Sequence, residues 1–391
     1  MAQSADALLI VDDNEDNRYT LMRRLQRQGY ANLTSANDGA EALQLLRERP
    51  FDLVLLDIMM PVLNGYQVLE QMRADARLRH VPVIMISALD EMDSVIRCIE
   101  LGAEDYLAKP FNPTLLRARV GACLEKKRLR DELLQHARRM EKELEAARAI
   151  QLSMVPVVFP PPTAGNPLSV YATLRPAYEV GGDLHDCFWM RPGQLCLLVA
   201  DVSDKGAAAA LYMARAKTTL RLVAMRLAGE SARRPTPAEL VSAANEELCR
   251  DNPMAMFLTL VLVIVDTATG AVDWCNAGHT LPCRVRAGGA VSTLPQGRSI
   301  PVGVRPAMLV SSGSLQLEPG ETLFAYTDGI TEATDAAGDF FGEQRLESVL
   351  ASAAGRGPEE LVTTILAAVS SFAAGAPPAD DIAAFACRWH P

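Results

Sequence analysis

The chain has 391 residues, 49% of them hydrophobic, and a formal net charge of -10 at pH 7. This length predicts two domains, and the negative charge argues against a DNA-binding regulator or a protein with general affinity for anionic lipid. No stretch approaches the roughly 20 uncharged apolar residues of a membrane helix, and the start lacks a basic segment with a cleavage site. We therefore expect a soluble cytoplasmic protein.

The eight cysteines are scattered along the chain, with no C-x-x-C pair among them. Most stand among apolar residues, as small hydrophobic side chains do. The pattern predicts neither a zinc site nor a disulfide framework.

From about residue 7 to residue 129, apolar segments of strand length alternate with segments of helical periodicity. Five such pairs follow one another, beginning with ALLIVDD and NRYTLMRRLQRQG and ending with DYLAKP and NPTLLRARVGACL. This order predicts an α/β fold with a doubly wound, parallel five-stranded sheet and helices on both faces. Such sheets bind their ligands beyond the carboxyl ends of the strands.

Reactive side chains stand at the ends of these predicted strands. Asp12 and Asp13 end the first strand, Asp57 the third, Ser87 the fourth and Lys109 the fifth. Three carboxylates in one pocket need a divalent cation, and Mg²⁺ prefers such oxygen ligands. A carboxylate beside the metal could then attack phosphorus, with the ammonium and hydroxyl groups binding the transferred oxygens. The alternative, that these are only solvated loop residues, is disfavoured by the complete set.

The segments VDDNEDN, LLDIMMPVLNGY, MISA and YLAKPF resemble the receiver domain of bacterial two-component response regulators, over nearly all of residues 7–123. The resemblance implies that Asp57 accepts a phosphoryl group from a histidine kinase or a phosphotransfer protein. It also implies that Ser87 and Tyr106 report phosphorylation to the far face of the domain. The Mg²⁺ ligands that it implies are Asp12, Asp13, Asp57 and the Met59 carbonyl. Residues 1–124 would then form an input switch.

Residues 125–154 contain no glycine or proline and mix both charge signs. Seven residues recur at alternating steps of four and three, so they share one helical stripe: Leu133, Ala137, Met140, Leu144, Ala147, Gln151 and Met154. The pattern predicts a helical linker that can pair with its twin as a coiled coil in a homodimer. The alternative is a single helix lying on one of its own domains. The helix should stop at Pro156.

From about Leu168 onward, many alternating strands follow one another. Two long helical blocks interrupt them, residues 206–229 and 236–251. The second block opens with a capping box from Thr236 to Glu239. Strands joined mostly without crossover helices favour antiparallel sheets, so we expect an α+β sandwich flanked by helices over residues 155–391.

Acidic residues also stand at strand ends in this second domain: Asp183, Asp201, Asp328, Asp380 and Asp381. The first lies in EVGGDLHD, residues 179–186, which is either a solvated loop, a glycine-rich phosphate cradle or part of a cation site. Oxygen ligands without His or Cys suit Mg²⁺ or Mn²⁺ rather than Zn²⁺. Two such cations bridged by a carboxylate could lower the pKa of water and neutralise a phosphate ester. The spacing alone leaves the three interpretations open.

The motifs EVGGDLHD, VADVSDKG, AALYMARAKTTLR, NAGH, IPVG, YTDGITEA and DDI resemble the bacterial PPM-type serine/threonine protein phosphatases of the SpoIIE/RsbU branch, over roughly residues 148–389. The resemblance implies a PPM fold with two Mg²⁺ or Mn²⁺ ions. Asp201 would bridge the two metals, with the Val202 carbonyl on the second. Asp328 and Asp380 would hold the first metal, and Asp183 would bind it directly or through water. The implied substrate is a phosphorylated anti-sigma-factor antagonist.

Three positions depart from the family pattern, and one of them is His185, which replaces a commoner aromatic residue. Ala383 stands where a Thr is usual, and Asp204 stands where a Gly is common. The hydroxyl of that Thr is not a metal ligand, so we expect its loss to tune the site rather than abolish it.

Four other polar residues near the motifs are given structural roles. We expect His185 at the surface rather than as a proton donor, and His279 as a hydrogen-bonded residue at a turn. Glu179 and Asp186 are expected to be solvated or to lie behind the metal ligands.

The organisation predicts a response regulator whose output is dephosphorylation of a protein. Phosphorylation of Asp57 would shift the face formed by the fourth helix, fifth strand and fifth helix. The 125–154 helix would transmit this shift to the phosphatase domain, either by changing the geometry of the dimer or by ordering an element near the metal site. One alternative is a catalytically silent module that sequesters the partner under receiver control, and another is an enzyme for a small phosphorylated metabolite. The intact acids disfavour the first alternative, and the receiver and long helix disfavour the second.

Overall fold

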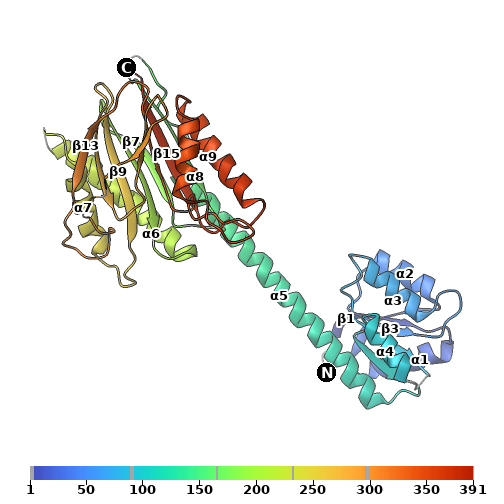
Figure 1. Cartoon of the computed structure of the whole chain (residues 1–391). Coiled ribbons are helices and arrows are strands. Elements are labelled where there is room, and N and C mark those ends of the chain that lie inside the picture. Colours follow the sequence, from blue (N-terminus) through green and yellow to red (C-terminus); the bar gives the residue numbers. More distant parts are fainter. Residues whose placement is uncertain are drawn as a thin grey trace. The chain divides into compact units, whose positions relative to one another are not determined.

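The computed structural model describes residues 4–88, 92–163, 166–230, 233–295, 297 and 299–390. The chain divides into two compact units, Met1–Met140 and Glu141–Pro391. Figure 1 shows one sheet with its helices in the first unit and a stack of two sheets with helices in the second.

The first unit is a parallel sheet of order β2-β1-β3-β4-β5 with helices between its strands. This arrangement confirms the predicted doubly wound fold. Its elements are β1 (Ser4–Val11), α1 (Glu15–Arg27), β2 (Tyr30–Ala36), α2 (Gly39–Glu48), β3 (Leu53–Asp57), α3 (Gly65–Ala74), β4 (Val83–Ser87), α4 (Met92–Glu100), β5 (Asp105–Ala108) and the first part of α5 (Pro113–Met154).

The central strand β3 explains why the strand sequences are continuously apolar. All of its residues are buried. Val54 and Leu56 pack in the cluster that holds residues of α2 and α3, whereas Leu53 and Leu55 pack with residues of α1 and α5. Because both faces of the sheet are covered by helices, the four positions before Asp57 are all apolar.

Helix α5 runs without interruption from the first unit into the predicted linker. We expected the linker helix to begin at residue 125, but the structure has one helix from Pro113 to Met154. Between Gly121 and Pro156 the sequence holds no glycine or proline that would break it. Lys126 and Lys127 tie this helix to the segments just before β5 and β3 through ion pairs with Glu104 and Asp52, at 2.5 Å and 2.8 Å.

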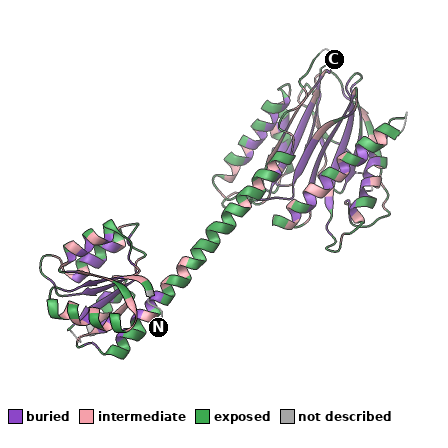
Figure 2. Ribbon diagram, turned by 180° about the vertical axis from the view of Figure 1, so that it is seen from behind, coloured by how far each residue is buried: buried purple, intermediate pink, exposed green. Residues whose placement is uncertain are grey.

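The predicted apolar stripe of α5 is exposed over most of its length (Figure 2). Leu133 and Met140 expose 69% and 65% of their surface. Gln151, which lies on the same stripe, is instead buried. The middle of the stripe therefore offers apolar surface, while Gln151 near its end already contacts other residues of the second unit.

The second unit contains two antiparallel five-stranded sheets, of order β13-β10-β9-β8-β7 and β12-β11-β14-β15-β6. They confirm the predicted α+β sandwich. Its elements are β6 (Leu168–Arg175), β7 (Leu184–Arg191), β8 (Gln194–Val202), α6 (Gly206–Glu230), α7 (Pro237–Cys249), β9 (Leu258–Asp266), β10 (Ala271–Ala277), β11 (Cys283–Val285), β12 (Val291–Thr293), β13 (Ser312–Gln316), β14 (Thr322–Tyr326), α8 (Gly342–Ser352), α9 (Pro358–Ala373) and β15 (Ile382–Trp389).

Strand β8 shows how the layers of this unit are built. Leu197 and Val199 pack between the two sheets, whereas Cys196 and Leu198 pack against α6 and α7. On the other side, α8 and α9 cover the second sheet (Figure 1). The alternation of side chains along each strand thus produces four layers, helix, sheet, sheet and helix.

Helices α8 and α9 were not among the helical blocks that the sequence analysis singled out. The signal was present, because Pro358 stands at the start of α9 and the buried residues Leu361, Ile365 and Val369 recur at steps of four. Strand β7 begins directly after Asp183.

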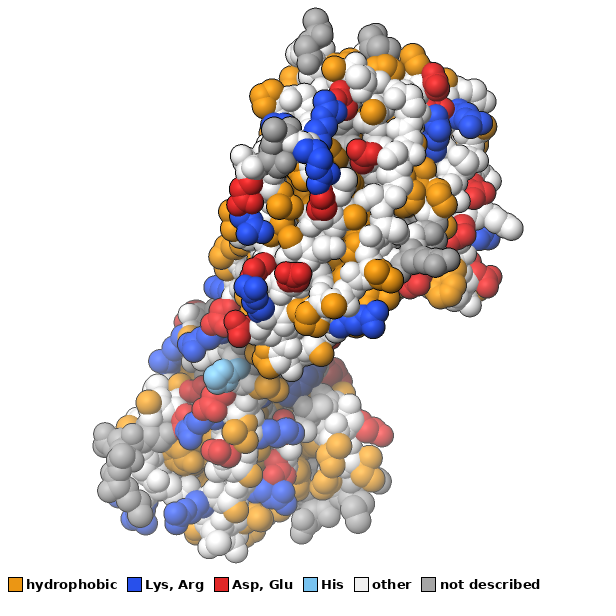
Figure 3. Space-filling model, turned by 90° about the vertical axis from the view of Figure 1, so that its left-hand side faces the viewer, with side chains coloured by type: hydrophobic (Ala, Val, Ile, Leu, Met, Phe, Trp, Pro, Cys, Tyr) orange, Lys and Arg blue, Asp and Glu red, His pale blue; other side chains and the backbone are white. Residues whose placement is uncertain are grey.

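Three general features of the described residues concern the surface charges, the cysteines and the length of apolar helices. Basic and acidic side chains are interspersed on the face that Figure 3 shows. All eight cysteines are free. In the described part of the chain, no helix combines the length and the apolar character needed to cross a membrane.

Two candidate acidic sites

Three aspartates gather at the carboxyl end of the parallel sheet. One carboxylate oxygen each from Asp12, Asp13 and Asp57 lie within 4.8 Å of one another. Strands β1 and β3 are neighbours, so their carboxyl ends bring Asp12 and Asp57 together. Lys109, which follows β5, places its Nζ atom 2.8 Å from Asp12 Oδ2 and 2.9 Å from Asp57 Oδ1. The structure therefore brings together the four charged residues that the strand ends indicated.

The electrostatics of this site favour a bound cation. Burial raises the pKa of Asp57 to about 6; Lys109 opposes the rise, and Asp12 and Asp13 add to it. When ionised, three carboxylates and one ammonium carry a net charge of -2. An excess of oxygen-borne negative charge at a buried position suits a hard divalent ion. These residues fit the predicted Mg²⁺.

Local contacts hold the two buried aspartates in place. Asp12 Oδ1 accepts hydrogen bonds from Asn14 N at 2.9 Å and Asn17 Nδ2 at 3.1 Å. Gly65 packs on the backbone after β3, where a Cβ atom would lie 2.2 Å from the Asp57 carbonyl oxygen. The glycine of the LLDIMMPVLNGY motif is therefore required by this close approach.

The remaining predicted receiver residues lie on β4, β5 and the loop after β3. Ser87 is fully buried at the end of β4, and its carbonyl accepts a hydrogen bond from Lys109 N at 2.7 Å. Tyr106 lies half-buried on β5. Met59 follows Asp57 by two residues in the loop. The switching roles of Ser87 and Tyr106, and the Met59 carbonyl as a ligand, stay predictions.

Burial and neighbouring carboxylates raise the pKa of three aspartates of the second unit. Burial first, and then the neighbouring Asp201, raise the pKa of Asp183. Burial, followed by Asp328 and Asp380, raises the pKa of Asp201 to about 7. Burial and Asp380 likewise raise the pKa of Asp328. The predicted ligands are thus close enough for their charges to interact.

This second cluster is wider than the receiver site. Among the described residues, the receiver trio is the only group whose three ligand atoms all lie within 4.8 Å of one another. The negative charge that folding concentrates around Asp201 still needs a counter-charge. Carboxylates without His or Cys partners suit Mg²⁺ or Mn²⁺, so the donor set fits the predicted cations.

Thr327 positions the most buried of these acids, and the sequence analysis missed it. Its Oγ1 donates a hydrogen bond to Asp183 Oδ2 at 2.7 Å, and it accepts one from Ala383 N at 2.8 Å. Ala383, which stands where a Thr is usual, thus contributes through its backbone. The replacement leaves that backbone contact intact.

The two glycines of EVGGDLHD are explained by close approaches. A Cβ atom at Gly181 would lie 1.8 Å from Asp381 Oδ2, and one at Gly182 would lie 2.9 Å from the Val202 carbonyl oxygen. The Asp381 carboxylate accepts hydrogen bonds from Gly182 N at 3.0 Å and Ala177 N at 2.7 Å. Asp381 therefore fastens the loop that carries the predicted ligand, a role that the sequence analysis did not assign.

The end of α5 holds the same loop. Gln151 Nε2 donates to the Gly181 carbonyl at 2.5 Å, and Gly181 N donates to Gln151 Oε1 at 3.2 Å. On the other side of Asp183, His185 Nε2 lies 3.0 Å from the Pro156 carbonyl. The prediction that His185 lies at the surface was wrong: it exposes only 2%, because β7 is covered, and burial lowers its pKa.

Asp186 is also buried rather than solvated. It exposes only 2%, and its carboxylate contacts Lys217 Nζ at 3.1 Å and Arg221 Nη2 at 2.5 Å. Two cations of α6 thus neutralise it, whereas Glu179 is exposed. Of the three acids in EVGGDLHD, Asp183 is the one that joins the aspartate cluster.

Two residues of the VADVSDKG segment, Asp204 and Lys205, have roles that the structure explains. Lys205 Nζ lies 2.9 Å from Asp380 Oδ2. Asp204 has a backbone φ of 75°, in the left-handed region that Gly, Asn and Asp tolerate best. The departure from Gly at this position therefore preserves the turn.

His279 agrees with the structural role expected for it. Its Nδ1 atom lies 2.7 Å from Thr259 Oγ1, and its backbone N–H donates to Asn276 Oδ1 at 2.8 Å. Burial lowers the pKa of His279 to about 4, so the imidazole is neutral at pH 7.

Known proteins match the two units separately. Residues 191–390 match the family model described as Stage II sporulation protein E (SpoIIE), and residues 8–121 match that of the response regulator receiver domain. The SpoIIE match begins at Arg191, the last residue of β7, so it does not include the EVGGDLHD motif.

Curated relatives align with one part of the chain or another. The probable transcriptional regulator ycf27 of Guillardia theta is 44% identical over 124 residues, which cover 32% of this chain and 47% of the relative. Protein IcfG of Synechocystis sp. is 29% identical over 228 residues, covering 53% of this chain and 35% of the relative. The chain thus spans about half or less of the length of these relatives.

A solved structure supports the fold of the second unit. The SiaA-PP2C domain of Pseudomonas aeruginosa superposes with a TM-score of 0.57 at 20% identity, covering 65% of this chain and 98% of that one. At this identity the similarity concerns the fold.

Proposed function

The chain belongs to the SpoIIE family and also carries a receiver domain, and on this premise we propose a response regulator whose output is metal-dependent hydrolysis of phosphoserine or phosphothreonine on a partner protein. The observation that carries the proposal is the presence of two acidic sites, the trio around Asp57 and the four aspartates around Asp201. In this proposal residues 1–124 receive the signal, residues 125–154 transmit it and residues 155–391 hydrolyse the ester.

In the receiver, the Asp57 carboxylate accepts the phosphoryl group of a histidine kinase or phosphotransfer protein. The P–N bond of the phosphohistidine breaks as the P–O bond to Asp57 forms, and the leaving imidazole takes a proton. Lys109, already 2.9 Å from Asp57, neutralises the arriving oxygens. Mg²⁺ would be held by Asp12, Asp13, Asp57 and the Met59 carbonyl.

In the phosphatase domain, two Mg²⁺ or Mn²⁺ ions would be held by Asp183, Asp201, Asp328, Asp380 and the Val202 carbonyl. When bound, such ions activate water and neutralise the phosphate ester. Thr327 orients Asp183 through its hydrogen bond, and Asp381 fixes the loop behind it. In the hydrolysis, the oxygen of a water molecule forms a new P–O bond as the P–O bond to the serine or threonine oxygen breaks. A proton of that water goes to the leaving oxygen, and no phosphoenzyme forms.

Helix α5 supplies the route between the two domains. Its first part is ion-paired to the receiver through Lys126 and Lys127. In its last turn, Gln151 hydrogen-bonds Gly181, which lies two residues before Asp183. The exposed apolar stripe that includes Leu133 and Met140 offers a seam for a second copy, so we place the homodimer contact there. A change in that seam would reach the metal site through Gln151.

The substrate is proposed from family membership. The resemblance to phosphatases of the SpoIIE/RsbU branch implies that the substrate is a phosphorylated anti-sigma-factor antagonist. Since the chain carries a net charge of -10, recognition of such an anionic partner must depend on shape and on local positive groups.

The test is release of phosphate from a phosphoserine peptide with Mn²⁺, by wild type, Asp201→Ala and the exposed control Asp273→Ala. We expect wild type and the control to release phosphate and Asp201→Ala to lose at least about 100-fold, by analogy with the loss of other electrostatic groups at reaction centres. If wild type and Asp201→Ala were equally inactive with and without a phosphoryl mimic on the receiver, the catalytic proposal would fall. The silent binding module would then replace it.

A further inference from the structure

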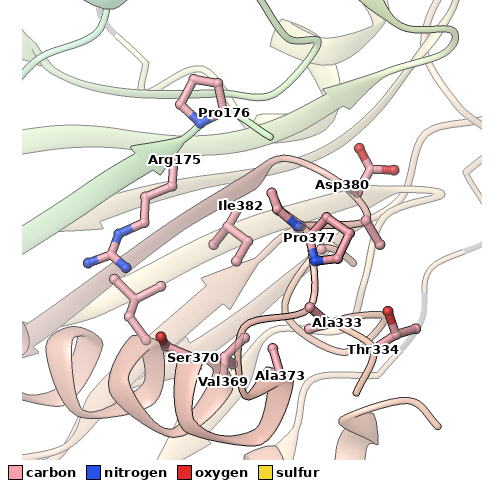
Figure 4. Close-up of a pocket in the computed structure, with 15 residues that line it drawn as sticks. Arg175, Pro176, Ala333, Thr334, Val369, Ser370, Ala373, Pro377, Asp380 and Ile382 are labelled. Atoms are coloured by element: carbon pink, nitrogen blue, oxygen red, sulfur yellow. The ribbon is translucent and has the colours of Figure 1, made fainter. Parts of the chain in front are cut away.

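A pocket of about 300 Å³ adjoins the predicted metal ligand Asp380 (Figure 4). Its walls come from the end of β6, the loop after β14, one face of α9 and the loop before β15. Figure 4 shows Arg175 and Asp380 on opposite sides, with Ile382 and Pro377 between them. Gly329, which follows Asp328, also lines it. The pocket is therefore continuous with the aspartate cluster.

The walls of this pocket are mostly apolar and firmly held. Leu366 and Val369 of α9 are buried, and they face it together with Ile382 of β15. Pro377 and Pro378 form the loop side, and their rings restrict the backbone there. Such a surface suits an apolar side chain more than a hydrated ion.

Arg175 is the positive group in this lining. Asp380 is already paired with Lys205, whereas the Arg175 guanidinium has no hydrogen bond or ion pair with the described residues. A guanidinium left unpaired beside apolar walls attracts a carboxylate, which it binds through two parallel hydrogen bonds.

The volume limits what can enter. Ligand pockets span about 300–1,000 Å³, so this one is at the lower end of the range. It can take one large side chain rather than a nucleotide or a similar cofactor. Because Asp380 lies at its edge, the occupant must lie next to the phosphate that is to be hydrolysed.

We infer that this pocket selects the polypeptide substrate, taking one large aliphatic side chain next to the phosphorylated residue while Arg175 binds a flanking carboxylate. The inference rests on the proposed phosphatase function and adds a substrate class to it. The partner is a phosphoprotein whose site combines an aliphatic and an acidic residue beside the phosphoserine or phosphothreonine.

The test compares phosphoserine peptides that differ only beside the phosphorylated residue. One flanking position carries Leu or Ala, and the other carries Glu or Gln. Each pair is made twice, with the Leu or Ala position before the phosphoserine and after it. For wild type we expect kcat/KM to favour Leu over Ala about 10-fold, as one filled apolar pocket allows. We expect Glu to be favoured over Gln about 2- to 5-fold, as for an exposed ion pair.

Two variants separate the contributions. Arg175→Ala should bring the ratio of kcat/KM for the Glu and Gln peptides to about 1. Ala373→Leu fills the pocket from the end of α9, so it should bring the ratio for the Leu and Ala peptides to about 1. The matched controls Arg226→Ala and Ala367→Leu change exposed residues outside the lining and should keep the wild-type ratios.

A small aryl phosphate reaches the metal site without filling the pocket. It therefore distinguishes failure of the pocket inference from failure of the proposed phosphatase function. If wild type hydrolyses the aryl phosphate and all peptides with ratios near 1, the pocket inference is overturned and the phosphatase function stands. Wild-type ratios that persist in both Arg175→Ala and Ala373→Leu also overturn it. If neither aryl phosphate nor peptides are hydrolysed, the proposed function fails and the inference fails with it.

Discussion

Replacing Gln151 by methionine removes both hydrogen bonds between the end of α5 and Gly181 while keeping the side-chain volume. The Gly181 N–H and carbonyl are buried, so both groups are left without a partner. Each lost bond to a buried group costs about 1–2 kcal/mol, which gives about 2–4 kcal/mol in total. For a unit of this size, 1 kcal/mol lowers the melting temperature by about 2–4 °C. We expect the transition of the second unit to fall by at least about 4 °C in calorimetry.

The same substitution should weaken metal binding. Asp183 lies two residues after Gly181, and groups that orient ligands typically contribute 10- to 100-fold to metal affinity. The concentration of Mn²⁺ that half-activates aryl phosphate hydrolysis should therefore rise about 10-fold in Gln151→Met. The control is Gln135→Met, an exposed position on the same helix. If both variants match wild type in melting temperature and Mn²⁺ requirement, the idea that α5 holds the Asp183 loop is refuted.

Three further predictions concern the same unit. Asp186→Ala leaves Lys217 buried without its partner, so chemical denaturation should show a loss of about 3–5 kcal/mol, and a loss below 1 kcal/mol would contradict the buried ion pair. The pKa of His279 is lowered from 6.5 to about 4, so the unfolded chain binds its proton first as the pH falls. Wild type should therefore lose about 2 kcal/mol more than His279→Gln between pH 7 and pH 5, and parallel stability curves would refute a buried neutral imidazole. Gly181→Ala should destabilise the loop and reduce hydrolysis because its Cβ would lie 1.8 Å from a carboxylate oxygen, whereas Gly229→Ala meets nothing within 4 Å and should be neutral or slightly stabilising in a thermal melt.

The receiver site could be predicted almost completely from the sequence because topology alone assembles it. In a parallel doubly wound sheet, the carboxyl ends of neighbouring strands meet at one edge, so Asp12, Asp57 and Lys109 had to converge once the five strands were recognised. The alternation of strand and helix made that recognition direct. No contact outside this edge was needed.

The second site could be predicted only in part. Its aspartates stand at strand ends, but the groups that hold them come from distant segments. Asp381 binds Gly182 across 199 residues, and Gln151 binds Gly181 across 30. No periodicity along the sequence reports such contacts. The sequence held one signal for Gln151. It is a polar residue on an otherwise apolar helical stripe, and such a residue indicates a hydrogen-bond partner at that position.

The burial of His185 and Asp186 could not be predicted for a similar reason. Their polarity suggested a solvated turn. Although β7 is the edge strand of its sheet, both side chains are buried, and cations of α6 compensate the charge of Asp186. By contrast, α8 and α9 were predictable from their helical periodicity.

The central claim is that the receiver controls a phosphatase in the same chain. The most direct test is the rate of phosphate release from a phosphoserine protein substrate with Mn²⁺ and Mg²⁺, before and after adding beryllium fluoride as a phosphoryl mimic. We predict a change of several-fold in wild type and none in Asp57→Ala, in which the acceptor carboxylate is missing. A robust wild-type rate that the mimic leaves unchanged would contradict the account.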